Sequence, residues 1–257
     1  MPEARRDTGR RLGFFQLIVP SLDPETLVLG AADARHLRRS VRARPGDRVP
    51  ATDGAGGRGE VQIVRWSATA AEVRPRLERR EAHPRRRLWV ATRAAEGRFD
   101  WLVEKAVELG AWGICPLRGV AVGADGVRDR HGRWQRLARA AVEQCGTAWL
   151  PVLESPRALG DLISEEGPPR FTRVILADPM GPPAASLSSQ ARGPGDHLLL
   201  AGPPEGFGGA ERAALAKVSG LERVSLGPRR LRSETAALAL LALVGSLPAP
   251  ETPPSHP

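Results

Sequence analysis

Residues 226–238, "LGPRRLRSETAAL", join the end of an apolar strand to the start of an apolar helix. Ser233 is placed to cap that helix, and Glu234 falls in the first turn, where the positive end of the helix dipole favours a carboxylate. Capping does not explain the three cations that precede the helix, because this end of a helix disfavours positive charge. These cations are Arg229, Arg230 and Arg232. The segment therefore indicates a function beyond helix capping.

A second segment, residues 201–211, "AGPPEGFGGAE", places a Gly-rich turn between an apolar strand and a helix-compatible stretch. A strand, a turn and a helix in that order are typical of a ligand-binding loop. Backbone amides at a helix start favour phosphates, although other cofactors also lie against such loops. The chain lacks the sequence patterns of P-loops, dinucleotide-binding turns, zinc proteases and serine hydrolases. Hydrolase triads, zinc catalysis and ordinary dinucleotide binding are therefore disfavoured.

The composition permits one large domain or two smaller ones, since 41% of the 257 residues are hydrophobic. The formal net charge of +9 suits a polyanionic partner, with nucleic acid as the first candidate. A biased genome or life at high temperature explains the charge equally well. Lys occurs only at positions 105 and 217, and Tyr and Asn are absent. Charge alone leaves both interpretations open.

The two cysteines, Cys115 and Cys145, form no metal-binding or disulfide pattern. We therefore expect reduced thiols, no metal and a cytoplasmic location. The N-terminus has no apolar signal region, and the longest apolar stretch, residues 236–244, is too short to cross a bilayer.

The pattern of turns divides the chain into two folded parts with polar ends. Residues 1–11 predict a disordered basic tail, and residues 248–257 predict a disordered Pro-rich tail. Between them, residues 12–80 are typical of a small β-rich domain, and residues 84–247 alternate strands and helices as in a parallel α/β sheet.

One short helix is predicted inside the β-rich part, in the stretch 33–49, with His36, Leu37 and Val41 at helical spacing and a turn at 45–47. Five arginines surround it: Arg35, Arg38, Arg39, Arg42 and Arg44. A solvated charged face and a phosphate-contacting surface explain them equally well, because the guanidinium fork also suits phosphate.

Four motifs, taken together and in order, resemble the bacterial 16S ribosomal RNA uridine-N3 methyltransferases of the SPOUT superfamily. They are "HLRRSVRARPGD" at 36–47, "EKAVELGAWGICPL" at 104–117, "AAVEQCG" at 140–146 and "LGPRRLRSETAAL" at 226–238. The resemblance covers nearly the whole folded chain.

The resemblance implies a PUA-like β-barrel that binds RNA over 12–80 and a SPOUT-type trefoil-knotted methyltransferase domain over 84–247. It also implies S-adenosylmethionine as the cofactor, a homodimer, and small-subunit ribosomal RNA, free or assembled with protein, as the partner. The implied cofactor-binding residues are Leu200, Gly202, Pro203, Gly206, Leu226, Gly227, Leu231, Thr235 and Ala236. The predicted RNA-binding residues are His36, Arg38, Arg39, Arg42 and Arg229.

The implied reaction needs an anion stabiliser, because uracil N3 is a poor nucleophile until its proton leaves. Arg232 is our candidate for that role. Glu234 either accepts the proton or orients Arg232, and the orienting role is the stronger candidate. The uridine has to leave any stacked arrangement to reach the methyl group.

The chain departs from the family pattern in the cofactor loop and at two cationic positions. The family loop reads Gly-Pro-Glu-Gly-Gly, whereas Pro204 stands here in place of its Glu and Glu205 in place of a Gly. Ala95 and Thr147 replace family cations. Two alternatives therefore stay open: a paralogue that methylates another RNA site, and a non-catalytic RNA-binding relative with impaired cofactor binding.

Overall fold

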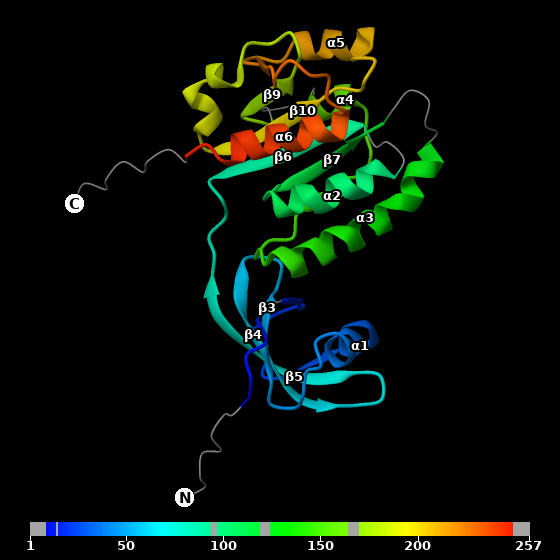
Figure 1. The fold of residues 1–257 in the computed structure, drawn as a ribbon, viewed down its shortest axis with the longest axis vertical. Coiled ribbons are helices and arrows are strands. Elements are labelled where there is room, and N and C mark those ends of the chain that lie inside the picture. The colour runs from blue at the N-terminus through cyan, green and yellow to red at the C-terminus, as the bar shows by residue number, and fades with distance from the viewer. Residues whose placement is uncertain (1–8, 14, 94–96, 119–123, 164–169, 249–257) are drawn as a thin grey trace, which may run out of the picture. The chain divides into compact units, whose positions relative to one another are not determined.

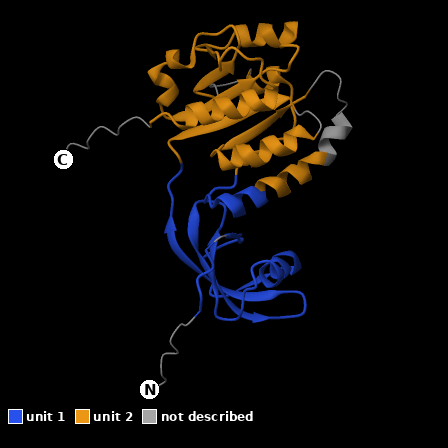
Figure 2. Cartoon of the chain, viewed as in Figure 1, with its two compact units in different colours: residues 1–83, 139–150 blue, residues 84–138, 151–257 orange. Residues whose placement is uncertain are grey.

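The computed structural model describes residues 9–13, 15–93, 97–118, 124–163 and 170–248. The polar tails predicted at 1–11 and 248–257 fall mostly outside these ranges, as does Ala95. The chain forms two compact units (Figure 2). The first comprises residues 1–83 and 139–150, and the second comprises residues 84–138 and 151–257.

The first unit is built on a five-stranded sheet with the order β1-β3-β4-β5-β2 (Figure 1). Its strands are β1 (Leu17–Ile18), β2 (Leu27–Leu29), β3 (Arg48–Thr52), β4 (Gly57–Trp66) and β5 (Ala71–Arg80). All pairs are antiparallel except β1 with β3. Two register shifts between β4 and β5 bend this long hairpin, as β-bulges do. The β-rich character read from the turn pattern is present.

Helix α1 (Ala31–Arg39) packs Ala34 and Leu37 into the core of the first unit. The helix ends earlier than the spacing of Val41 suggested, so that expectation was wrong. The amides of Ser40 and Val41 both donate to the carbonyl of His36, at 2.9 and 3.2 Å, which closes the last turn. Arg42 then has a positive φ of 54°, which no helical residue adopts. The arginines after residue 39 therefore lie on a loop.

Residues 139–150 belong to the first unit although the preceding chain belongs to the second. Buried polar groups anchor them. The amide of Gln16 donates to the carbonyls of Val142 and Thr147, at 3.1 and 2.6 Å, and the hydroxyl of Thr52 donates to the carbonyl of Ala148 at 3.0 Å. The motif "AAVEQCG" at 140–146 thus packs as part of the first unit.

The second unit contains a six-stranded, fully parallel sheet with the order β11-β9-β10-β6-β7-β8. Its strands are β6 (Arg86–Arg93), β7 (Gly113–Leu117), β8 (Val152–Leu153), β9 (Arg173–Ala177), β10 (Gly195–Ala201) and β11 (Glu222–Val224). The sheet is not in chain order, because β10 inserts between β9 and β6. The α/β class expected from the sequence is present.

Helices cover both faces of this sheet. They are α2 (Arg98–Glu108), α4 (Leu159–Ile163), α5 (Gly209–Ala216) and α6 (Ser233–Gly245), with 3-10 turns at 184–186 and 189–192. Helix α3 (Ala124–Cys145) contacts α2 through Trp134 and Phe99, and its last residues, 139–145, belong to the first unit. Leu162 of α4 and Leu215 of α5 pack with Leu198 and Leu200 on one face. Helix α6 packs on β6 and β10 and against α2 (Figure 1).

Two helix starts differ from the expectations that Ser233 is the N-cap of the last helix and that the helix after the Gly-rich turn begins at Glu211. Ser233 is the first helical residue of α6, and Arg232 is the N-cap, so Ser233 does not cap the helix. Helix α5 begins at Gly209, two residues before Glu211, because the Glu211 carboxylate accepts the Gly208 amide proton at 2.7 Å and closes the first turn. Among the described residues, no helix is long and apolar enough to cross a membrane.

Candidate functional site

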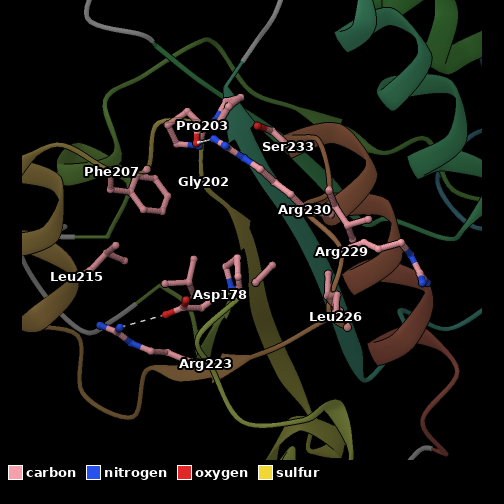
Figure 3. Close-up of a pocket in the computed structure, with 18 of the residues that line it drawn as sticks. Asp178, Gly202, Pro203, Phe207, Leu215, Arg223, Leu226, Arg229, Arg230 and Ser233 are labelled. Atoms are coloured by element: carbon pink, nitrogen blue, oxygen red, sulfur yellow. Dashed lines mark hydrogen bonds and ion pairs between the residues drawn. The ribbon is translucent and has the colours of Figure 1, made fainter.

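A cavity of about 350 Å³ opens in the second unit where β9, β10 and β11 end (Figure 3). Asp178 follows β9, Gly202 follows β10 and Leu226 lies just after β11. The carboxyl ends of neighbouring parallel strands meet at one edge of a sheet, which is where open α/β sheets bind ligands. The two segments that the sequence singled out, 201–211 and 226–238, are thereby brought together.

Three stretches of chain form the cavity wall, one after each strand. The wall residues are Leu176, Ala177, Asp178, Pro179, Gly202, Pro203, Pro204, Gly206, Phe207, Arg212, Leu215, Arg223, Leu226, Gly227, Arg229, Arg230, Leu231, Ser233 and Ala236. Seven of the nine residues expected to bind a cofactor are among them. The exceptions are Leu200, whose side chain is fully buried in the sheet core, and Thr235, which is exposed on α6.

The wall combines apolar side chains with one ion pair. Phe207, Leu215 and Leu226 supply apolar surface, as Figure 3 shows. Across from Phe207, Arg223 pairs with the carboxylate of Asp178 at 3.1 Å. A mostly apolar cavity with a few placed polar groups is typical of a small-molecule site.

The loop after β10 closes one side of the cavity with a tight turn. The amide of Gly206 donates to the carbonyl of Pro203 at 2.8 Å, and Gly206 has a positive φ of 82°. Gly202 is fitted closely against the next turn of the loop, because a Cβ placed there would lie 3.0 Å from the Phe207 ring. Both glycines therefore have a structural reason to be glycine.

Glu205 does not line the cavity. Its carboxylate accepts from Arg93, the last residue of β6, at 2.8 Å, and two thirds of the Glu205 side chain is exposed. Pro204 lines the cavity, and its carbonyl accepts from Arg230. The two residues that depart from the family loop thus keep the turn and leave the cavity free of the extra carboxylate.

The arginine-rich segment before α6 forms the opposite side of the cavity. Arg229 and Arg230 line it, and in Figure 3 the Arg230 side chain extends past Ser233 toward Pro203, whereas that of Arg229 points away from Ser233. Arg232, the predicted anion stabiliser, is exposed at the N-cap of α6 between the wall residues Leu231 and Ser233. Its place is at the rim of the cavity and not among the wall residues.

Glu234 is nearly buried, with 11% of its side chain exposed, and it pairs with Arg98 at the start of α2 at 3.3 Å. The ion-pair partner of Glu234 is thus on another helix, and it is not the neighbouring Arg232. This arrangement ties the N-terminal end of α6 to α2. It favours a structural role for Glu234 over proton transfer.

The predicted RNA-binding residues of the first unit lie in and after α1. The His36 ring contacts that of Phe15 in a tilted arrangement, with centroids 4.5 Å apart, and Arg38 lies over Trp66 at 4.9 Å. Arg39 is exposed on the last turn of α1, and the exposed backbone at Arg42 carries the positive φ. The fifth predicted residue, Arg229, belongs to the cavity wall of the second unit.

Sequence reasoning missed several wall residues, above all Asp178 and Arg223. The signal for Asp178 was available, since an acidic residue directly follows the apolar run "VILA" at 174–177. This signal points to the cavity only when the sheet order is known, because that order brings the end of β9 next to the end of β10. Phe207, Arg212 and Leu215 belong to the turn and to α5, whose start the sequence placed two residues late.

No group of three or more potential metal ligands occurs among the described residues. Cys115 is buried on β7, and burial raises the pKa of its thiol far above the usual value. Cys145 is exposed.

The chain thus combines a parallel α/β unit, with a small-molecule cavity at the carboxyl edge of its sheet, and a small β-rich unit. Family models identify the parts. The model described as "RNA methyltransferase domain" matches residues 83–245, and the model described as "RNA methyltransferase PUA domain" matches residues 29–75. The chain belongs to this RNA methyltransferase family, and its N-terminal unit is PUA-like.

Two relatives of this chain have the same name. The ribosomal RNA small subunit methyltransferase E of Synechocystis is 28% identical over 86% of this chain and 73% of that protein. The protein of the same name from Mycobacterium bovis is 29% identical over 87% of this chain and 88% of that protein.

Two solved structures have the same fold. The ribosomal RNA small subunit methyltransferase E of Neisseria gonorrhoeae, bound to S-adenosylmethionine, has a TM-score of 0.78 at 22% identity, over 91% of this chain and 98% of that chain. A protein from Legionella pneumophila, in complex with the bound cofactor S-adenosylmethionine, has a TM-score of 0.75 at 21% identity, over 92% and 96%.

Proposed function

We propose that the protein transfers a methyl group from S-adenosylmethionine to the N3 atom of a uridine in 16S ribosomal RNA. The family membership and the shared name of the relatives support an RNA methyltransferase that acts on the small subunit. The observation that carries the proposal is the cavity at the carboxyl edge, walled by the Gly-rich loop 201–211 and by the segment 226–238, which resembles the uridine-N3 enzymes.

The residues of the cavity fit S-adenosylmethionine. A volume of about 350 Å³ lies within the range of small-molecule sites. Apolar walls at Phe207, Leu215 and Leu226 suit an adenine ring, and the Asp178 carboxylate suits ribose hydroxyls or a positively charged group. We assign cofactor contacts to the loop residues Gly202, Pro203 and Gly206, and to four residues of the facing segment. Those four are Leu226, Gly227, Leu231 and Ala236.

The chemistry requires help for the base, not for the cofactor, because the bound sulfonium supplies an already activated methyl group. Uracil N3 becomes nucleophilic as its proton leaves, and negative charge then spreads over the ring. We assign stabilisation of that charge to Arg232, a cation at the N-cap of α6 and at the cavity rim. Glu234 holds the end of α6 against α2 through Arg98 and so fixes the backbone that carries Arg232.

We assign the contacts that hold the RNA to basic residues in each of the two units. Arg38, Arg39 and Arg42 of the first unit and Arg229 beside the cavity are assigned to phosphates flanking the target. His36 contacts the ring of Phe15 within the first unit, and we assign it a supporting role for the three arginines of that unit. Such a protein acts where ribosomes are made, so the proposal includes a cytoplasmic location.

A homodimer and a trefoil knot around the cofactor loops complete the proposal. Sedimentation equilibrium tests the first: we expect twice the mass of one chain, and a monomer at micromolar concentration would contradict it.

Titration calorimetry with S-adenosylmethionine tests the cofactor assignment. We expect saturable binding that Gly202→Leu abolishes, because a side chain at residue 202 collides with Phe207 and enters the cavity. Gly209→Leu is the matched control, since Gly209 is exposed, lies outside the wall and has open space around its Cβ position. Absence of binding by the native protein at millimolar cofactor would overturn the enzyme proposal and leave the non-catalytic RNA-binding alternative.

A further inference from the structure

Arg93, at the carboxyl end of β6, connects two parts of the chain that flank the cavity. One terminal nitrogen of its guanidinium donates to Glu205 at 2.8 Å, and the other lies 3.2 and 3.3 Å from the two oxygens of Glu211. Glu205 lies in the cofactor loop, and Glu211 lies in the first turn of α5. The side chains of Arg93 and Glu211 are each 18% exposed, so this part of the network is shielded from solvent.

Glu211 extends the connection to the end of the loop. Its carboxylate also accepts the amide proton of Gly208 at 2.7 Å. Arg93 therefore holds the loop twice, directly at residue 205 and through Glu211 at residue 208. Between these points, the Gly206 amide closes the turn on the Pro203 carbonyl at 2.8 Å.

The other flank of the loop is held by the arginine-rich segment. Arg230 donates to the carbonyl of Pro204, the residue directly before Glu205. The tip of the loop thus lies between two arginines from different parts of the second unit, with a side chain bound by one and a backbone carbonyl bound by the other.

We propose that Arg93 is a positioning residue that clasps the cofactor loop through Glu205 and Glu211. Glu205 is then the loop's half of the clasp and not a cofactor ligand, which accounts for a carboxylate at a position where the family pattern has glycine. The inference rests on the proposed function, since it names what holds the site's loop. A loop fixed before binding loses less conformational entropy when the cofactor binds.

The clasp acts on cofactor binding and not on methyl transfer. Its loss should therefore raise the KM for S-adenosylmethionine and leave kcat nearly unchanged. Arg93→Met removes both ion pairs and keeps an apolar stem of similar length. We expect it to raise the Kd and KM for S-adenosylmethionine about tenfold, with kcat at saturating cofactor changed less than about twofold. Glu205→Gln removes one pair and should raise the Kd about threefold.

The double variant separates a clasp from two unrelated effects. Because Glu205 acts through Arg93, Arg93→Met with Glu205→Gln should bind no worse than Arg93→Met alone. Arg133→Met is the matched control. Arg133 pairs with Asp100 at 2.7 Å in the same unit, and among the described residues it forms no ion pair with the cofactor loop. Additive losses, or an equal loss in Arg133→Met, would overturn the proposal.

Hydrogen exchange distinguishes failure of the clasp from failure of the proposed function. In the cofactor-free protein, Arg93→Met should accelerate exchange of the Gly206 and Gly208 amides, both of which donate within the loop. If the native protein binds no S-adenosylmethionine and this acceleration occurs, the proposed function fails and the clasp stands. If exchange is unchanged, the clasp is wrong.

Discussion

The amino and carboxyl edges of the parallel sheet in the second unit are formed by the same strands but differ in structure. Side chains bind one another at the amino edge, and loops surround a cavity at the carboxyl edge. At the amino edge, Asp196 at the start of β10 accepts from Arg87 at 2.9 and 2.5 Å and from the indole of Trp89 at 2.6 Å. Arg170 stacks on the same Trp89 at 4.3 Å. At the carboxyl edge, the same strand ends at Ala201, and the next residue, Gly202, lines the cavity.

The difference lies in what the polar groups are bound to. At the amino edge, side chains of neighbouring strands bind one another. Their hydrogen bonds therefore stabilise the folded sheet. Carboxyl-edge arginines bind groups of the surrounding loops. Arg230 and Arg212 donate to the carbonyls of Pro204 and Phe207, and Arg93 donates to the carboxylate of Glu205, so these contacts shape the loops around a cavity. The amino edge should therefore govern stability, and the carboxyl edge should govern binding and catalysis.

The largest effect is expected from Arg232→Ala at the carboxyl edge. Loss of a preorganised anion stabiliser costs about 3–4 kcal/mol in the transition state, so kcat should fall about 10²- to 10³-fold. Arg232 is exposed, so the free energy of unfolding should change by less than about 0.5 kcal/mol. Single-turnover methylation and urea unfolding measure the two quantities.

Arg192→Ala is the control, because Arg192 is also exposed and lies in the turn before the amino edge of β10. Turnover of Arg232→Ala close to that of this control would contradict the catalytic assignment.

The next largest effect is expected at the amino edge. Asp196→Asn loses the charge that three donor contacts share, and we expect a loss of about 2–3 kcal/mol in the free energy of unfolding. The affinity for S-adenosylmethionine should be unchanged under folding conditions. Asp161→Asn should be silent in both assays, since Asp161 is exposed and lies 3.9 Å from its partner Arg118. If Asp196→Asn weakens cofactor binding while stability is kept, the two edges are not separate.

A smaller effect is expected from Gly206→Ala in the cofactor loop. The space around a Cβ at this position is open, so only the positive φ of 82° opposes the substitution. We expect a cost of about 1 kcal/mol, seen as a rise in the cofactor Kd of about fivefold. Gly209→Ala, three residues on at the start of α5, has no positive φ and should bind as the native protein does. Equal affinities for the two variants would show that the turn is not held in its observed form.

The smallest effect concerns acid sensitivity. The Arg87 guanidinium holds the pKa of Asp196 below its usual value, helped by the Trp89 indole. A carboxyl group with a lowered folded-state pKa contributes stability above its unfolded pKa and loses it as pH falls through the folded value. Native protein should therefore lose more stability than Asp196→Asn as the pH drops below about 4. Parallel acid-unfolding curves for the two proteins would contradict this contribution.

Much of the parallel sheet was predictable because its central strands are apolar runs, and two of them, β9 and β10, are followed directly by Asp178 and Gly202. The two loops of the cavity were predictable from residues 201–211 and 226–238 for the same reason, since each follows such a run. Helix α4 was missed, because its five residues are too few to show a helical period.

The rest depends on contacts between residues far apart in the chain. Asp178 joins the cavity because β9 lies beside β10 and β11, and no local pattern encodes that order. The partner of Glu234 is Arg98, 136 positions earlier. Glu205 looked like a defect in the loop until Arg93, 112 positions earlier, proved to be its partner.

The most direct test of the central claim is mass spectrometry of 16S ribosomal RNA nucleosides from cells that lack this protein. The account predicts that 3-methyluridine disappears, that the native protein restores it, and that Arg232→Ala does not. Unchanged 3-methyluridine in the deletion strain would contradict the account, and loss of a different methylated nucleoside would identify a paralogue with another target.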